Sequence, residues 1–152
     1  MIKIREYTFY DINQIVKCGK NNLPLFYGIF DMLINIFNTN QICYVAEENN
    51  NICGFIIAEY EKIEGSKIFN IHIQSIGVNK NKRCKNIGSR LIERLKQNYH
   101  KQISLYVKKD NIRAISFYKK NNFEVIKKKI NYYKNYFKNE SNDAYLMKLI
   151  KL

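Results

Sequence analysis

Tryptophan is absent from the 152-residue sequence, and proline occurs once, histidine twice and cysteine four times. The cysteines show no C-x-x-C spacing, and two histidines are too few for the usual zinc patterns, so we expect unpaired thiols and no metal site. No apolar run approaches the ~18–20 residues that span a membrane. The amino-terminal segment "MIKIREYTFYDI" has no apolar run that would serve as a secretory signal. These absences favour a cytoplasmic protein without a membrane contact.

Charge is predominantly of one sign, with 26 basic against 13 acidic residues and a net charge of +13. Such an excess would favour RNA, ribosomes or polyanionic cofactors as partners. Only five of the basic residues are arginine, however, and arginine is the better marker of phosphate or base recognition. The chain is also crowded with residues of AT-rich codons, so drift accounts for much of the lysine. We expect no specific DNA binding and keep ribosome docking as a secondary hypothesis.

The pattern of β-branched and aromatic residues predicts the strands. They cover residues 42–47, 52–60, 69–78, 103–107, 123–133 and 144–150. The intervening segment "ENNN" (48–51) predicts a hairpin turn, because asparagine tolerates left-handed backbone conformations.

Helical spacing predicts four helices. Asp11 and Gln14 form a capping-box pattern that opens the first helix, whose inner face carries Ile12, Ile15 and Val16. The other three cover residues 31–38, a segment that starts at Ile87, and residues 110–122 with Asp110 or Asn111 as the cap. The order β-α-α-β-β-β-α-β-α-β-β predicts one α/β (α+β) domain over residues 1–152, with a mixed sheet and helices on both faces.

The segment "KRCKNIGSR" (82–90) lies where a strand ends and a helix begins. The first backbone N–H groups of a helix have no partner within it, and the helix dipole favours an anion there. Gly88 would let a phosphate approach the backbone closely. Four cations flank this position, namely Lys82, Arg83, Lys85 and Arg90. The segment therefore predicts a phosphate site.

The longer segment "SIGVNKNKRCKNIGSRLIERL" (75–95) resembles motif A of the GCN5-related N-acetyltransferase (GNAT) family. The family fingerprint Gln/Arg-x-x-Gly-x-Gly/Ala binds the pyrophosphate of acetyl-CoA. It runs here from Arg83 to Gly88, with Asn86 in place of the first glycine. Asparagine tolerates a positive φ, so we expect the loop to keep its shape. The resemblance implies coenzyme contacts from Ile76, Gly77, Val78, Arg83, Cys84, Lys85, Asn86, Ile87, Gly88 and Ser89.

A later segment, "DNIRAISFYKKNNFEV", resembles the family pattern N-x-x-A-x-x-x-Y before Gly-Phe. Its members here are Asn111, Ala114, Tyr118 and the pair Asn122-Phe123. Asn111 is then expected to bind the pantetheine arm, to cap the helix, or to do both. The resemblance places Tyr118 near the coenzyme sulfur, where it would donate to the departing thiolate. Helical spacing alone favours Tyr118 as a core aromatic.

Four further segments, "NLPLFY", "HIQSIGV", "NYY" and "DAYLMK", resemble the RimI/Ard1/San group of protein N-terminal acetyltransferases. The match runs from Ile4 to Leu149. It implies the GNAT fold with a mostly antiparallel sheet, acetyl-CoA as cosubstrate, and direct attack of a protein or peptide α-amine on the thioester. We keep association with a ribosome or an auxiliary subunit as a hypothesis.

Two residues compete for the role of base. The position of His72 holds a catalytic tyrosine in San-type enzymes and often a histidine in Ard1-type enzymes. The partner position is usually histidine in both, but here it is Tyr106. A tyrosine with a pKa near ~10 is a poor base, so we favour His72. A lone histidine on a strand is more often a packed, hydrogen-bonded side chain.

The acceptor site is expected to be apolar. Ard1-type enzymes carry glutamate where Leu25 stands, so the loop favours methionine or another apolar first residue. The resemblance implies substrate contacts from Leu23, Pro24, Leu25, Tyr27, Gln74, Tyr132 and Tyr133. The alternative interpretation is that Tyr132 and Tyr133 belong to an ordinary aromatic-rich hairpin.

Two other functions stay open. The first is a GNAT enzyme for a lysine side chain or a small-molecule amine, which would need carboxylates in the acceptor cleft. The second is a catalytically inert GNAT-like module that docks on RNA or ribosomes through its positive charge. Transfer to an amine requires no covalent enzyme intermediate, and we expect no cysteine to act as a nucleophile.

Overall fold

The computed structural model describes residues 1–23, 40–62, 69–83, 85–98, 102–133 and 142–150. The helix that the sequence predicts over 31–38 lies outside these residues. No helix within them is both long and apolar enough to cross a bilayer.

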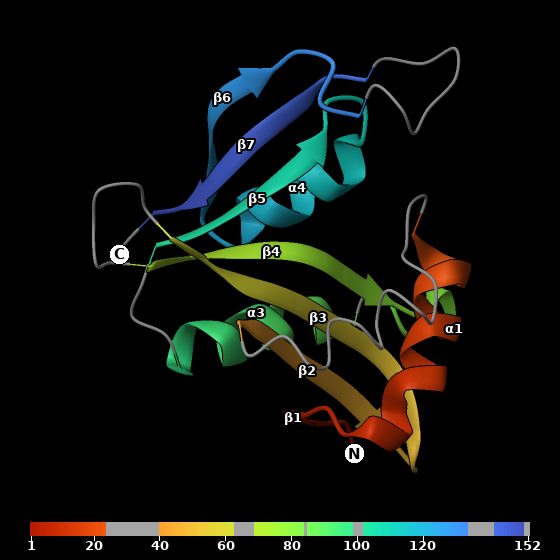
Figure 1. The fold of residues 1–152 in the computed structure, drawn as a ribbon. Helices are drawn as coiled ribbons and strands as arrows, with labels where there is room; N and C mark the ends of the chain where they lie inside the picture. The colour runs from red at the N-terminus through yellow and green to blue at the C-terminus, as the bar shows by residue number, and fades with distance from the viewer. Residues whose placement is uncertain (24–39, 63–68, 84, 99–101, 134–141, 151–152) are drawn as a thin grey trace.

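A seven-stranded sheet of order β1-β2-β3-β4-β5-β7-β6 forms the described part of the fold (Figure 1). Its strands are β1 (Lys3–Glu6), β2 (Gln41–Glu48), β3 (Asn51–Lys62), β4 (Phe69–Val78), β5 (Ile103–Lys108), β6 (Phe123–Lys129) and β7 (Ala144–Leu149). Every neighbouring pair is antiparallel except β4 and β5, which are parallel. The predicted mixed, mostly antiparallel sheet is confirmed.

Helices cover both faces of the sheet, as predicted (Figure 1). They are α1 (Ile12–Asn22), α3 (Ile87–Asn98) and α4 (Ile112–Lys120), with short 3-10 turns at η1 (Phe9–Asp11) and η2 (Lys80–Lys82). The predicted inner face of α1, Ile12, Ile15 and Val16, is buried against β2 and β3 in one apolar cluster. On the other face, α3 and α4 share a larger cluster with the central strands. The sheet therefore separates two cores.

Asparagines with a positive φ occupy the turns at the positions that the sequence predicts. Asn49 and Asn50 have φ values of 51° and 61° and form a two-residue hairpin loop between β2 and β3. Asn86 and Asn122, which replace glycines of the family pattern, have φ values of 56° and 65°. Both exchanges preserve the backbone geometry for which glycine is normally chosen, because asparagine is among the residues that tolerate it.

Asp11 is the N-cap of α1, as predicted, but the predicted capping box with Gln14 does not form. Asp11 Oδ2 accepts hydrogen bonds from Thr8 N at 2.7 Å and Thr8 Oγ1 at 3.0 Å, and it pairs with the Arg5 guanidinium at 2.6 Å. Gln14 Oε1 instead accepts from Ile52 N on β3 at 2.9 Å. The box lies one turn earlier, around η1, because Arg5 on β1 holds the Asp11 carboxylate there.

The strand predicted over 123–133 is too long. β6 ends at Lys129, and Asn131 has a φ of 54°, which interrupts extended structure. Tyr132 and Tyr133 consequently lie in the turn after β6. The helix predicted over 110–122 is shorter, from Ile112 to Lys120.

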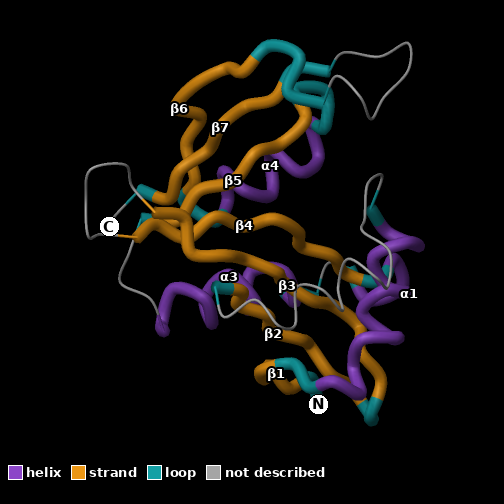
Figure 2. The backbone as a smooth tube through the Cα atoms, in the orientation of Figure 1, coloured by secondary structure: helices purple, strands orange, loops and turns teal. Residues whose placement is uncertain are grey.

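The parallel strands β4 and β5 diverge along their length (Figure 2). Only three pairs join them, from Ile71–Ile103 through His72–Ser104 to Ile73–Leu105. A bulge in β4 follows at once, because Ala58 pairs with Ile73 while the preceding Ile57 pairs with Ser75. Beyond this point the strands separate and leave an opening in the sheet.

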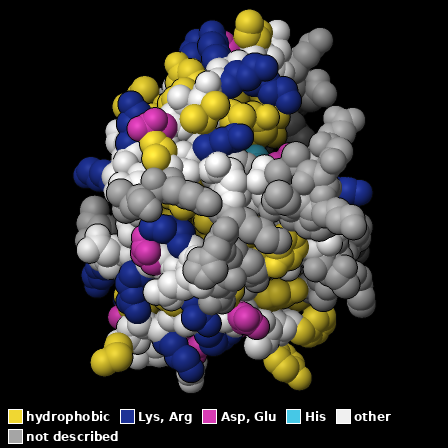
Figure 3. Space-filling view, turned by 90° about the vertical axis from the view of Figure 1, so that its left-hand side faces the viewer, with side chains coloured by type: hydrophobic (Ala, Val, Ile, Leu, Met, Phe, Trp, Pro, Cys, Tyr) yellow, Lys and Arg dark blue, Asp and Glu magenta, His cyan; other side chains and the backbone are white. Residues whose placement is uncertain are grey.

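Lysine and arginine side chains are spread over the face shown in Figure 3, where acidic and apolar side chains interrupt them. The net charge of +13 therefore does not gather into one basic patch on this face.

Candidate active site

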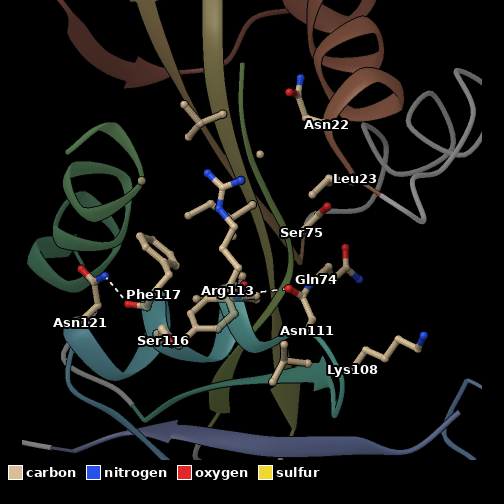
Figure 4. A pocket seen from close by; sticks show the side chains of 18 of the residues that line it. Asn22, Leu23, Gln74, Ser75, Lys108, Asn111, Arg113, Ser116, Phe117 and Asn121 are labelled. Carbon is tan, nitrogen blue, oxygen red and sulfur yellow. Dashed lines mark hydrogen bonds between the residues drawn. The ribbon is translucent and has the colours of Figure 1, made fainter. Parts of the chain in front are cut away.

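A pocket of about 1400 Å³ occupies the opening between β4 and β5 (Figure 4). The end of α1, the start of α3 and one side of α4 complete its walls. Ile71, Ile73 and Leu105 belong to the core on the α3 side of the sheet. Because side chains alternate along a strand, His72 and Tyr106 point to the opposite side. The pocket is thus lined by residues from both faces of the sheet.

Most predicted site residues line this one pocket. Those of the proposed catalytic and substrate sets are His72, Tyr106, Tyr118, Leu23, Gln74, Tyr132 and Tyr133. Those of the proposed coenzyme set are Ile76, Gly77, Val78, Arg83, Asn86, Ile87, Gly88, Ser89 and Asn111. Lys85 is described but does not line the pocket. Cys84, Pro24, Leu25 and Tyr27 lie outside the described residues.

The amino terminus of α3 has the properties of an anion site. The first backbone bond of this helix runs from Arg90 N to Asn86 O at 2.9 Å. The N–H groups of Ile87, Gly88 and Ser89 therefore have no partner within the helix, and all three residues line the pocket. Unpaired N–H groups and the helix dipole together attract negative charge. The terminus fits the pyrophosphate expected from the sequence.

Gly88 has a packing role that the sequence did not reveal. A Cβ atom at this position would lie 2.8 Å from Cζ of Phe117 on α4. The missing side chain therefore lets α4 approach the first turn of α3. Close approach of a phosphate to Gly88 stays a prediction.

The flanking cations differ from the sequence expectation, because protein groups hold three of them. Lys82 pairs with Glu48. Arg83 donates from Nε to Val78 O at 3.1 Å and from Nη2 to Asn22 Oδ1 at 3.4 Å. Arg90 donates from Nη2 to Ile2 O at 2.9 Å. Through these contacts, the three side chains stabilise the end of β4 and the start of α3.

Helix α4 presents a cap and a buried phenol to the pocket. Asn111 Oδ1 accepts from Ala114 N at 3.1 Å, which confirms the predicted cap. Tyr118 is 8% exposed, and its ring lies 5.7 Å from the ring of Phe123. Burial raises the pKa of Tyr118 far above its usual range, so the hydroxyl stays protonated. Tyr118 is therefore both a core aromatic and a potential proton donor at the pocket wall.

His72 is neutral and oriented. Its Nδ1 lies 3.0 Å from Oγ of Ser104, its buried neighbour on β5. Burial lowers the pKa of the imidazole below its ordinary value, and the carboxylates of Glu61 and Glu59 partly oppose this shift. Glu59 stands opposite His72 on β3 and also lines the pocket. When Nδ1–H donates to Ser104, Nε2 has a free lone pair that can accept a proton.

A row of aromatic rings extends from His72. The His72 and Tyr106 ring centroids are 5.4 Å apart, Tyr106 stacks on Tyr132 at 4.2 Å, and Tyr133 meets Tyr132 edge-on at 4.9 Å. The ammonium of Lys129 lies 5.3 Å from the Tyr106 centroid and 5.0 Å from that of Tyr132. This arrangement favours a packing surface for a substrate backbone, with Tyr106 as a platform.

The described cysteines are poor nucleophiles. Cys18, Cys43 and Cys53 are free and buried. Burial raises the pKa of the Cys18 thiol to about 11, and it raises the pKa values of the other two thiols as well. Thiols that stay protonated near neutral pH do not attack carbonyl groups readily. Within the described ranges, no three His, Cys, Asp or Glu side chains gather as metal ligands would.

Among the residues that sequence reasoning missed are Glu59 and Arg113, which line the pocket, and Ser104, which contacts His72 from β5. Glu59 and Ser104 flank His72 on the two neighbouring strands, and only the register brings them together. Arg113 lines the pocket from the first turn of α4. The sequence contained a pattern that indicates Arg113, because Arg113 precedes Phe117 by four residues and so lies on the same face of the helix.

The fold and the pocket define a class of enzyme in which a polyanionic donor and an acceptor meet at an opening between two strands of a sheet. Residues 39–125 match the family model described as the acetyltransferase (GNAT) domain. A curated N-alpha-acetyltransferase from Sulfolobus acidocaldarius is 30% identical over 156 residues, which cover 95% of this chain and 90% of that relative.

Two solved structures are also similar to this chain. Ard1 from Thermoplasma volcanium superposes with a TM-score of 0.79 at 25% identity, covering 99% of this chain and 98% of that one. Naa20 from Chaetomium thermophilum, in complex with a bisubstrate analogue, gives a TM-score of 0.80 at 25% identity and covers 97% of this chain and 85% of that one. The chain belongs to the GNAT family and is an N-acetyltransferase that uses acetyl-CoA.

Proposed function

We propose that this protein transfers the acetyl group of acetyl-CoA to the α-amino group at the amino terminus of a protein or peptide. One observation carries the proposal: a single pocket connects the amino terminus of α3, with its unpaired N–H groups, to His72. The similarity to the Sulfolobus N-alpha-acetyltransferase supports the acceptor class. The bisubstrate analogue bound to Naa20 is consistent with both reactants occupying one pocket in this family.

His72 acts as the base in this proposal. Nδ1–H donates to Ser104 Oγ, so Nε2 takes one proton from the substrate ammonium, directly or through a water. The free α-amine has a pKa of ~7.7–8.0, so a histidine of lowered pKa need only remove a proton that is already labile. The amine nitrogen then forms the new bond to the carbonyl carbon of the thioester. It loses its second proton as the carbon–sulfur bond breaks, and this proton balances the one that the leaving thiolate takes up to become a thiol.

Tyr118 acts on the leaving side. Tyr118 lines the pocket from α4, and its hydroxyl stays protonated, so it can donate a hydrogen bond to the sulfur as the carbon–sulfur bond breaks. Asn111 is the N-cap of α4 and lines the same pocket, where it would contact the pantetheine arm. His72 and Tyr118 thus work from opposite sides of the opening.

The acceptor end combines apolar and acidic groups. Leu23 and the tyrosines 132 and 133 line it, which favours methionine or another apolar first residue. Glu59 beside His72 would attract the incoming ammonium. We place the reaction in the cytoplasm, on chains emerging from ribosomes, with or without an auxiliary subunit.

The test is acetylation of a peptide library that varies the first two residues, with the modified nitrogen located by mass spectrometry. A matched set carries a blocked α-amine and a free lysine. We expect α-acetylation of peptides with an apolar first residue and none of the blocked set. Acetylation confined to lysine would contradict the proposal.

Glu59 also favours a second candidate, a cationic small-molecule or lysine acceptor, because a carboxylate in the cleft suits any ammonium. The same library with added polyamines separates the two acceptors. An inert RNA-docking module is distinguished earlier, since it would not bind acetyl-CoA in a direct titration.

A further inference from the structure

Arg113 is a cation that points into the pocket from the first turn of α4 (Figure 4). Its side chain is exposed and lines the pocket. Within the described part of the chain, no hydrogen bond or ion pair joins its guanidinium to another residue. A guanidinium so placed is available to a ligand.

The helix geometry sets which ligand group it can meet. Arg113 and Phe117 are four residues apart and share one face of α4. Phe117 reaches the first turn of α3, because its ring occupies the space that a Cβ of Gly88 would fill. Arg113 therefore lies on the face of α4 that meets the α3 amino terminus, where three N–H groups have no helical partner.

The remaining cations of the pocket are less suited to this role. Protein groups hold Lys82 and Arg83, and Lys108 also has interactions of its own. Lys120 lines the pocket from the last turn of α4, seven residues and therefore about 10 Å along the helix from Arg113.

We propose that Arg113 binds a phosphate group of the coenzyme and adds a positive charge to the unpaired N–H groups at the amino terminus of α3. The planar guanidinium can donate two parallel hydrogen bonds to phosphate oxygens, which a lysine ammonium cannot do. The inference rests on the proposed function for the identity of the acyl donor. Arg113 is in this view a binding residue for the donor and takes no part in proton transfer.

The experiment measures the dissociation constant of coenzyme A by calorimetry for the wild type and for Arg113→Ala, Arg113→Lys and Lys119→Ala. Lys119 is the matched control, because it is exposed on the same helix but does not line the pocket. We expect Arg113→Ala to weaken binding about tenfold to a hundredfold, Arg113→Lys to recover part of the loss, and Lys119→Ala to stay within about twofold.

Two analogues identify the phosphate. With 3′-dephospho-coenzyme A, a contact to the 3′-phosphate predicts equal binding by the wild type and Arg113→Ala. A contact to the pyrophosphate predicts that the full difference persists. With S-acetyl-pantetheine, which has no phosphate, both proteins should show the same KM.

Unchanged affinity of Arg113→Ala for coenzyme A would overturn the inference, and so would an equal loss with S-acetyl-pantetheine, which would indicate a structural defect. These outcomes leave the proposed function intact, because the wild type still binds coenzyme A. A wild-type protein that fails to bind coenzyme A would instead overturn the proposed function itself.

Discussion

Replacing His72 tests the proposed chemistry most directly. His72→Ala removes the only described histidine and leaves the coenzyme wall on α3 and α4 untouched. A general base contributes about 10²–10⁴ to the rate, which corresponds to about 2.7–5.4 kcal/mol of transition-state stabilisation. We expect kcat to fall by that factor while the dissociation constant of acetyl-CoA stays within about twofold.

The pH profile of kcat gives the second readout. His72 must be neutral to take a proton from the substrate ammonium, so kcat falls as the pH drops through its pKa. Burial lowers that pKa, which places the acidic limb below the ordinary value of ~6.5. Glu59→Gln removes a charge that favours the imidazolium, so it should move the limb to still lower pH. His72→Ala should abolish the limb.

Two further variants and a stability measurement distinguish a loss of catalysis from a loss of folding. His72→Ala leaves the buried Ser104 hydroxyl unpaired, which costs about 1–3 kcal/mol of stability, so thermal unfolding must be recorded for each variant. Ser104→Ala keeps the imidazole but frees its ring, and we expect a kcat loss of about tenfold. Tyr106→Phe keeps the stack on Tyr132 and should cost little. A silent His72→Ala together with an inactive Tyr106→Phe would refute the reasoning and make Tyr106 the base.

Three more predictions follow from single contacts. Tyr118→Phe should lower kcat by about tenfold or more and leave peptide affinity unchanged, measured by steady-state kinetics, because only the hydroxyl toward the sulfur is lost. Gly88→Ala should lower the free energy of unfolding by about 1–3 kcal/mol through its clash with Phe117, and the double variant with Phe117→Leu should recover most of it. Asn122→Ala should cost about 1–2 kcal/mol in denaturant unfolding, whereas Asn122→Gly should cost less, because a φ of 65° strains a residue with an ordinary side chain.

Local signals explain what the sequence predicted well. The strand over 69–78 matches Phe69–Val78, and Asn86 and Asn122 adopt the positive φ that their place in the family pattern requires. These features depend on residues close in the chain. The capping box failed because Thr8 and Asp11 satisfy the same spacing rule as Asp11 and Gln14. Only the position of Arg5 on β1 decides between them, and that contact is tertiary.

The sequence predicted which residues belong to the site better than it predicted how those residues contact one another. Nearly every described residue that the family resemblance supplied lines the pocket, because motif positions carry over along the chain. The partners of those residues did not carry over. Ser104 reaches His72 through the parallel register, and Glu48 reaches Lys82 across more than thirty positions. Contacts between residues so far apart in the chain produce no periodic pattern in the sequence. A cation that is held by a protein group therefore cannot be distinguished from a free one by sequence alone.

The distribution of charge along the pocket explains how a protein of net charge +13 can accept a cationic substrate. At the coenzyme end, Arg113 and the unpaired N–H groups of α3 favour a polyanion. At the acceptor end, Glu59 lies opposite His72 and favours an ammonium. Each reactant therefore meets an opposite charge at its own end of the pocket, and the gap between β4 and β5 is where they meet. General basicity would repel the amine, so these few local groups, rather than the total charge, determine which reactant enters from which face.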